Sequence, residues 1–304
     1  MNMIEELTLG LTELHVSNFE RSLPFYTEIL GFTLLEQTDS TITLGNNAKE
    51  PILLLKEDVH LKKKPDHEPG LYHLAILLPA RKNLGTWLAH VIKKGYPLIG
   101  ASDHYFSEAI YLSDPDGIGV EIYADRPKDI WLGENGELKG GGNAPLDGDG
   151  LMQEAADSTW EGLPAGTVMG HLHFHLNPEE ANTFYVDTLG FHIRMAPPAS
   201  LFIAYGVYHH HLAFNAWGGG RKGAIDPSFS GIRSYTLIFP QETDRQSVVE
   251  RLTEAGIHVE TIEKSNEFVD PFGIRVRLQI EEIDKKEGAE HGQTDRSENS
   301  HFKR

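Results

Sequence analysis

An internal repeat constrains this chain more than any other feature. A Phe-Tyr pair followed by Leu-Gly-Phe occurs at residues 25–32 and again, in the same register, at residues 184–191. An Asp-Pro-x-Gly motif occurs at residues 114–117 and again at residues 270–273. Both motifs recur after about 160 residues, and self-similarity at a fixed offset indicates duplicated structural units. We therefore expect the C-terminal half to repeat the fold of the N-terminal half.

Each half divides again into two units with the same order of elements. Residues 8–16 alternate like a strand, and residues 19–30 have the apolar spacing of a helix that ends at Gly31, where a left-handed cap costs glycine little. Short strand-like runs follow. The same order recurs over residues 71–123, 168–214 and 232–280, with helices expected over 81–94, 178–189 and 244–255. The sequence therefore predicts an α+β fold of four βαβββ modules, with an Asp-Pro-x-Gly turn before the last strand of modules 2 and 4.

The repeat also predicts how the chain divides into domains. Residues 7–126 are expected to form an N-terminal domain of two modules, and residues 167–283 a C-terminal domain of two modules. Residues 127–166 are rich in Gly, Asp and Pro and are expected to form a linker with one short helix. Residues 284–304 have almost no apolar side chains, so we expect a disordered tail.

Composition limits the chemistry that this chain can perform. None of the 304 residues is cysteine, which excludes disulfides, thiolate metal sites and cysteine nucleophiles. A net charge of −18, from 27 basic and 45 acidic residues, disfavours a nucleic-acid partner. No apolar run approaches the roughly 20 residues that a membrane span needs, and no signal peptide is recognisable, so we expect a cytoplasmic protein without a membrane partner. Sixteen histidines stand out, several of them clustered.

Two sequence patterns within the modules point to one family. The first pattern runs from His104 through Tyr111 and the turn at 114–117 to Glu121, and the second is His-His-x-Leu-Ala-Phe at residues 209–214. Together with the four modules, they resemble the vicinal oxygen chelate superfamily, which includes glyoxalase I, fosfomycin-resistance proteins and extradiol dioxygenases. The resemblance covers about residues 8–282 and is strongest to bacterial two-domain dioxygenases of the catechol 2,3-dioxygenase type. Ser102 departs from the family, which usually has a small or apolar residue such as glycine two places before the histidine.

The resemblance implies a site for Fe(II), held by two histidines and one carboxylate, with open positions for substrate and O2. Family ligands come from the first and last strands of a module, at positions that carry His73, Glu121 and His171 in this chain. The corresponding positions in modules 1 and 4 are Leu11, Ser234 and Arg277. Family sites usually draw on modules 3 and 4, so we expect modules 2 and 3 to pair here instead.

Two alternatives to this ligand set stay open at this point. If modules pair as 1+2 and 3+4, no complete set forms, and His15 is the spare ligand beside His73 and Glu121. If the register of the third module differs, His173 replaces His171. Each of these histidines could also be an ordinary buried core residue, and Glu121 a surface carboxylate.

The resemblance implies extradiol cleavage of catechol or a substituted catechol by O2, to a muconic semialdehyde-type product, in the breakdown of aromatic hydrocarbons. His210 is the expected acid–base residue, and His104 and Tyr111 are expected to hydrogen-bond a substrate oxygen. Mn(II) suits the same ligands as Fe(II). The alternatives are a glyoxalase-like metal-dependent isomerase or thiol transferase, and a non-catalytic protein that binds aromatic compounds or antibiotics. Association into a homo-oligomer is left open.

Overall fold

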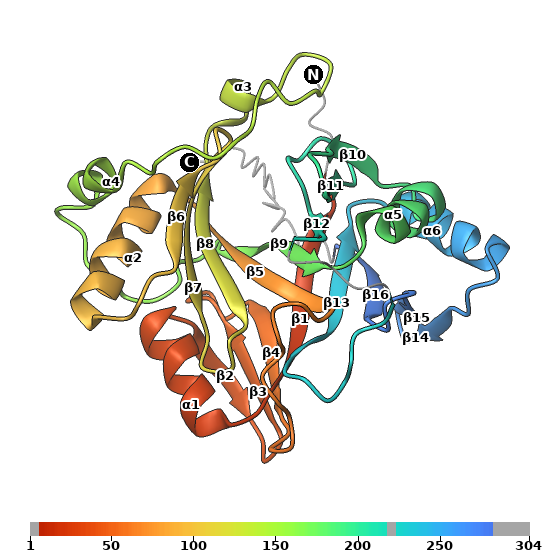
Figure 1. Cartoon of the computed structure of the whole chain (residues 1–304), viewed down its shortest axis with the longest axis horizontal. Coiled ribbons are helices and arrows are strands. Elements are labelled where there is room, and N and C mark those ends of the chain that lie inside the picture. The colour runs from red at the N-terminus through yellow and green to blue at the C-terminus, as the bar shows by residue number, and fades with distance from the viewer. Residues whose placement is uncertain (1–5, 218–222, 282–304) are drawn as a thin grey trace, which may run out of the picture.

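The structure is a computed structural model that describes residues 6–217 and 223–281. Two modules make up the N-terminal half (Figure 1). Module 1 contains β1 (Thr8–Val16), α1 (Phe19–Pro24), the π-helical turn η1 (Phe25–Ile29), β2 (Thr33–Gln37), β3 (Thr41–Gly45) and β4 (Pro51–Glu57). Module 2 contains β5 (Gly70–Leu78), α2 (Arg81–Lys94), β6 (Gly100–Asp103), β7 (Ser107–Ser113) and β8 (Gly119–Asp125).

The C-terminal half repeats this order after two short linker helices, α3 (Lys128–Trp131) and α4 (Gly148–Glu154). Module 3 contains β9 (Val168–His175), α5 (Pro178–Ala181), the π-helical turn η2 (Asn182–Thr188), β10 (His192–Met195), β11 (Ser200–Ala204) and β12 (Leu212–Asn215). Module 4 contains β13 (Gly231–Phe239), α6 (Glu242–Glu254), β14 (Glu260–Ile262), β15 (Ser265–Val269) and β16 (Arg275–Ile280). The predicted α+β fold of four βαβββ modules is confirmed, and the expected tail at 284–304 lies outside the described residues.

The first strands of the four modules lie side by side in the centre of the molecule (Figure 1). Within the described ranges, one sheet of 16 strands has β13, β1, β9 and β5 at its middle. Strand β5 pairs antiparallel with β9, and β1 pairs antiparallel with β13. Module 2 is therefore joined to module 3, as expected, and module 1 to module 4. The division into domains at 7–126 and 167–283 follows the sequence repeat and stays a prediction, since the strand pairs cross it.

The two repeated motifs contact each other within each half of the chain. The Tyr26 hydroxyl donates to Asp114 Oδ2 at 3.1 Å, and the Tyr185 hydroxyl donates to Asp270 Oδ2 at 2.5 Å. All four side chains are buried. The other oxygen of Asp114 accepts two backbone N–H groups of its own turn, one of them from Ile118. The Asp-Pro-x-Gly turns are thus formed as predicted, and each is tied to the helical turn of the preceding module.

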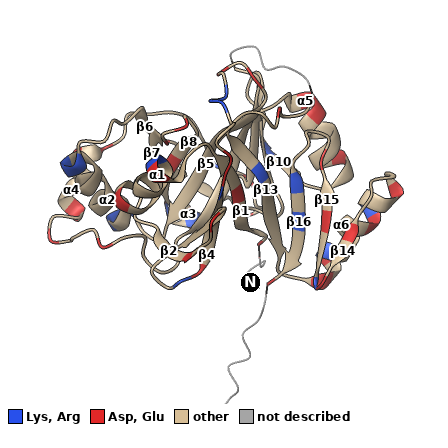
Figure 2. Ribbon diagram, turned by 90° about the horizontal axis from the view of Figure 1, so that it is seen from below, with Lys and Arg blue, Asp and Glu red and all other residues tan. Residues whose placement is uncertain are grey.

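The helices lie on the outside of the sheet, with α2 and α4 at one end of the molecule and α5 and α6 at the other (Figure 1). Acidic and basic residues are interspersed along these helices and the surrounding loops (Figure 2). The concave middle of the sheet is left uncovered by helices, and this is where the candidate site lies. Among the described residues, no helix is long and apolar enough to cross a membrane.

Candidate active site

Three side chains from three neighbouring strands converge at the centre of the sheet. Strand β8 runs parallel to β5 and places Glu121 beside Ala75, while β9 runs antiparallel and places His171 on the other side of Ala75. His73 precedes Ala75 by two residues. Side chains two residues apart on a strand point to the same face, so all three groups point into the concave side of the sheet.

The donor atoms of these three residues are close together. His73 Nε2 lies 3.0 Å from Glu121 Oε2 and 3.4 Å from His171 Nε2, and His171 Nε2 lies 3.3 Å from the same carboxylate oxygen. All three side chains are buried, at 9% exposure or less. Two ligands that each lie about 2.1 Å from an ion, at a right angle to each other, are about 3 Å apart. The arrangement therefore fits a single metal ion.

The electrostatics of the set also suit a metal. Burial alone would raise the pKa of the Glu121 carboxyl, but the charges and hydrogen bonds of His171 and His73 outweigh it and hold that pKa well below its usual value. Burial lowers the pKa of His171 to about 4, against the opposing effect of Glu121. A carboxylate is thus ionised and an imidazole is neutral at pH 7, which are the protonation states that metal ligands require.

The two alternative ligands lie outside this group of three. His173 follows His171 by two residues on β9 and pairs with His73 on β5. Asn215 Nδ2 donates to its Nε2 at 2.9 Å. His15 lies on β1, with its Nε2 2.8 Å from a carboxylate oxygen of Glu13. Neither belongs to the group of three whose donor atoms all lie within 4.8 Å of one another.

His104 and Tyr111 form a hydrogen-bonded pair beside the three converging residues. Tyr111 lies on β7 directly opposite Glu121, and its hydroxyl is 2.6 Å from His104 Nε2. His104 Nδ1 donates to the carbonyl oxygen of Gly142 in the linker, at 2.9 Å. This bond leaves Nε2 of a neutral His104 as an acceptor for the Tyr111 hydroxyl. Burial and then the Glu121 carboxylate raise the pKa of Tyr111, so the phenol keeps its proton.

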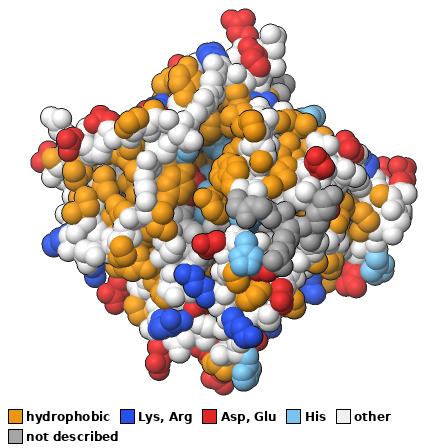
Figure 3. Space-filling view, in the orientation of Figure 1, with side chains coloured by type: hydrophobic (Ala, Val, Ile, Leu, Met, Phe, Trp, Pro, Cys, Tyr) orange, Lys and Arg blue, Asp and Glu red, His pale blue; other side chains and the backbone are white. Residues whose placement is uncertain are grey.

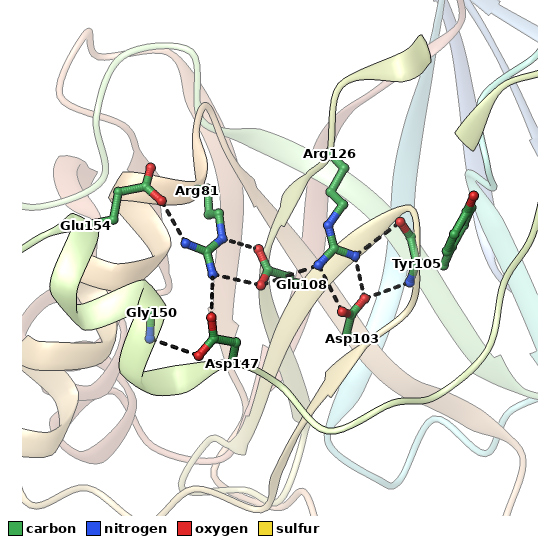
Figure 4. Close-up of polar contacts among 8 residues, drawn as sticks. All are labelled: Arg81, Asp103, Tyr105, Glu108, Arg126, Asp147, Gly150 and Glu154. Carbon is green, nitrogen blue, oxygen red and sulfur yellow. Dashed lines mark hydrogen bonds and ion pairs between the residues drawn. The ribbon is translucent and has the colours of Figure 1, made fainter. Parts of the chain in front are cut away.

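An ion-pair network on the outer side of β7 and β8 fixes the loop that carries His104 (Figure 4). The guanidinium of Arg126 binds both carboxylate oxygens of Asp103, which precedes His104. Glu108 is 2% exposed and binds Arg81, which also reaches Glu154 in α4. The network thereby docks the linker against module 2, on the side where the linker contacts His104.

His210 lies against the ligand set without joining it. Its ring centroid is 4.2 Å from that of His171, and its side chain is buried. Burial and then the positive charge that His171 can carry lower the pKa of His210 well below its usual value, so the ring is neutral. His210 lies just outside a strand, because β12 begins at Leu212 and residues 209–211 precede it.

Sequence reasoning missed the residues behind His210. His209 contacts the ring of His210 through their two Nδ1 atoms, at 2.9 Å. The other nitrogen of His209 lies 2.9 Å from Asp125, to which Tyr208 also donates. Asp125 follows Glu121 by four residues on β8, so strand alternation places both on one face. That spacing was the available signal in the sequence.

The candidate ligands line a cavity of about 730 Å³. Figure 3 shows the hollow in the face of the molecule, with hydrophobic side chains around histidines. His104, Tyr111 and His210 line the same cavity. The rest of the lining includes many apolar or aromatic side chains, among them Tyr72, Ile99, Ala101, Met195, Pro197, Phe202 and Trp217. The same cavity thus contains both the three candidate metal ligands and a large apolar surface.

Comparison with known proteins agrees with this geometry. Residues 8–122 match the family model of the glyoxalase/bleomycin resistance protein/dioxygenase superfamily. A catechol-2,3-dioxygenase of Bacillus subtilis (strain 168) is 39% identical over 271 residues, which are 88% of this chain and 95% of that protein.

Solved structures share the fold at low sequence identity. A putative dioxygenase from Bacillus subtilis has a TM-score of 0.61 at 12% identity, covering 92% of this chain and 86% of that chain. A single-residue mutant of glyoxalase I from Zea mays has a TM-score of 0.52 at 16% identity, covering 90% of this chain and 94% of that chain.

Proposed function

Because this chain belongs to the glyoxalase/bleomycin resistance protein/dioxygenase superfamily, we propose that it is an extradiol dioxygenase that cleaves catechol or a substituted catechol with O2. The observation that carries the proposal is the convergence of His73, Glu121 and His171 on one point in the cavity. Two histidines and one carboxylate are the ligands of non-haem Fe(II) oxygenases. The resemblance to a catechol-2,3-dioxygenase over most of both chains supports the substrate class.

In this proposal the metal is Fe(II), or Mn(II), and His73, Glu121 and His171 hold it. The bound ion supplies the electron transfer between the diol and O2 that ring cleavage requires. The position on β12 that is equivalent to Glu121 on β8, called here the fourth corner of the site, supports this assignment. Strand β12 places Ala213 beside His173, at the position in module 3 that corresponds to Glu121 in module 2. Because alanine offers no ligand atom, this corner stays free for substrate and O2.

The remaining residues bind the diol and move its protons. The neutral imidazole of His210 accepts a phenolic proton from the diol, a role typical of a buried general base. Tyr111 and His104 lie on the opposite side, where the Tyr111 hydroxyl, which stays protonated, exchanges its hydrogen bond to His104 Nε2 for one to a substrate oxygen. The apolar lining of the cavity excludes water around the ring, which strengthens these polar interactions.

The same corner argues against the isomerase alternative. Glyoxalase-like sites usually add a second carboxylate to the metal, whereas the corresponding residue of β12 is Ala213. No carboxylate beyond Glu121 belongs to the cluster of possible metal ligands found among the described residues. A dioxygenase uses the vacant positions for its two substrates, so the composition of this corner favours ring cleavage.

The test is turnover of catechol under ¹⁸O2 by protein loaded with Fe(II) without air. We expect one O2 consumed per catechol and a product that carries both labelled oxygen atoms. The Glu121→Gln variant serves as the inactive reference. Absence of O2 uptake by a metal-loaded wild type, together with isomerisation of a glutathione hemithioacetal, would replace this proposal with the isomerase.

A further inference from the structure

A buried chain of hydrogen bonds leads from His210 away from the cavity. His210 Nδ1 lies 2.9 Å from His209 Nδ1, and His209 Nε2 lies 2.9 Å from Asp125 Oδ1. This series of hydrogen bonds ends at Asp125, the last residue of β8, whose side chain is 22% exposed. Of His210, His209 and Asp125, the proposed reaction uses only His210, so the other two have no role in the mechanism above.

The packing around His209 holds this chain in one geometry. The side chain of His209 is completely buried. Its ring stacks on Phe106, with centroids 4.4 Å apart and planes 17° apart, and the Tyr208 ring lies 3.9 Å away. A ring held between two aromatic side chains cannot turn freely, so its two nitrogens stay directed at His210 and Asp125.

Both oxygens of Asp125 accept hydrogen bonds in this arrangement. Oδ1 faces His209, and Oδ2 accepts from the Tyr208 hydroxyl at 2.9 Å. The Tyr208 hydroxyl donates its one proton to Asp125, so the hydroxyl of Tyr123 is the donor in its 2.8 Å hydrogen bond to Tyr208. Gly170 leaves room for this hydroxyl, since a Cβ atom at that position would lie 1.9 Å from Tyr123 Oη. The residue before His171 is thus adapted to the same network.

The order of donors and acceptors in the chain sets the tautomer of His210. An imidazole ring with one proton donates that proton to a facing carboxylate oxygen, which places the proton of His209 on Nε2, beside Asp125 Oδ1. His209 Nδ1 is then an acceptor, and His210 must donate to it through Nδ1–H. A single ring proton on His210 is thereby placed on Nδ1. Its Nε2 keeps a free lone pair, as a general base requires.

We propose that His209 and Asp125 are positioning residues that fix the tautomer and orientation of His210 for proton transfer. The proposal rests on the proposed function, which makes His210 the base. When His210 Nε2 takes the phenolic proton, the positive charge that results lies one ring away from the Asp125 carboxylate. A carboxylate that orients a histidine and balances its charge acts in this way in the serine protease triad.

The test combines nuclear magnetic resonance with kinetics on the full chain. The ¹⁵N shifts of labelled histidines, in protein loaded with diamagnetic Zn²⁺ and in metal-free protein, report which ring nitrogen carries each proton. In wild type we expect His210 protonated on Nδ1 and His209 on Nε2. In Asp125→Leu, whose side chain cannot accept a hydrogen bond, we expect both histidines to populate mixed tautomers.

The same variant should lower kcat for catechol by about 10- to 100-fold, the usual cost of losing an outer hydrogen-bond partner. The KM for catechol and the iron content should stay at their wild-type values. Asp129→Leu, an exposed position on α3, is the matched control and should change neither tautomer nor kcat. This split between kcat and KM separates a positioning role from a loss of folded protein.

Two results would overturn the inference. One is a wild-type His210 that carries its proton on Nε2, which can be observed whatever the variant does. The other is an Asp125→Leu protein with wild-type tautomers and wild-type kcat. A wild type that shows the expected tautomers but does not cleave catechol would reject the proposed function and leave the hydrogen-bond assignment standing.

Discussion

Buried histidines in this cavity have two different proposed roles, which are metal binding for His171 and proton transfer for His210. Its ring packs on His171 at 4.2 Å, yet its Nδ1 is engaged by His209 and its other nitrogen remains for a substrate. The proposed metal ligand His171 and the proposed general base His210 therefore lie in direct contact. Their proposed roles can be separated by substitution, since only His171 belongs to the group that could hold a metal.

Replacement of His210 by Phe should lower catechol turnover by about 10²–10⁴-fold, because a general base is lost. Iron content and melting temperature should stay close to those of wild type, since phenylalanine keeps the ring packing. Steady-state kinetics, metal analysis and thermal unfolding, measured on the same preparation, check this. Normal turnover in an iron-loaded variant would remove His210 from the mechanism and make His104 the leading acid–base candidate.

At the residue level, the convergence of three candidate ligands could be expected from the sequence. His73, Glu121 and His171 were identified because the family resemblance places ligands on the first and last strands of a module, and the modules repeat. The role of Asp125 could not be predicted, although it shares a face with Glu121. Its partner His209 comes from a turn in another module, and no spacing along the chain shows that the two side chains meet.

Among the elements, each helical turn of modules 1 and 3 is fastened to a turn of the following module by one tyrosine. Tyr26→Phe leaves the buried carboxyl of Asp114 without this donor, which should cost about 1–3 kcal/mol of unfolding free energy. Denaturant unfolding of the variant against wild type measures this, with Tyr105→Phe, a ring 44% exposed, as the control. Equal stability of Tyr26→Phe and Tyr105→Phe would contradict the assigned role of the contact.

The same turn predicts how stability varies with pH. Burial raises the pKa of Asp114 from an ordinary value of 3.8 to about 7. Between about pH 4 and 7 the folded state therefore keeps a proton that the unfolded state releases, so the contribution of this group to stability falls as the pH rises. Asp114→Asn should flatten the unfolding free energy over this range. Parallel curves for the variant and wild type would show that the folded carboxyl is ionised throughout.

The elements themselves were largely predictable, whereas their pairing was not. The strand at 8–16 and the helix at 81–94 have the predicted bounds, because alternation and helical spacing are local signals. The pairing of module 1 with module 4 depends on the contact between β1 and β13, which are more than 200 residues apart. The expected pairing of modules 2 and 3 was inferred from where the metal-ligating residue types occur, rather than from any signal for strand pairing.

On the scale of the whole molecule, the cavity between modules 2 and 3 is large for an unsubstituted catechol. Its volume of about 730 Å³ is in the range that holds drug-sized ligands, and apolar and aromatic side chains make up much of its lining. Catechols with alkyl groups remote from the diol should therefore have lower KM values. KM should fall by up to about fourfold for each added methylene, because burial of one methylene contributes about 0.8 kcal/mol. Steady-state kinetics along a methyl, ethyl and propyl series measure this, and a constant KM would show that the apolar lining does not contact the substrate.

The most direct test of the whole account is the metal content of wild type and four single variants after loading with Fe(II) without air. Wild type should bind one ion per chain. His73→Ala, Glu121→Gln and His171→Ala should lose most of it, because each removes one of three converging donor atoms. His15→Ala, the alternative ligand that lies beside Glu13, should keep it. Full metal content in all three site variants, or its loss in His15→Ala alone, would contradict the site described above.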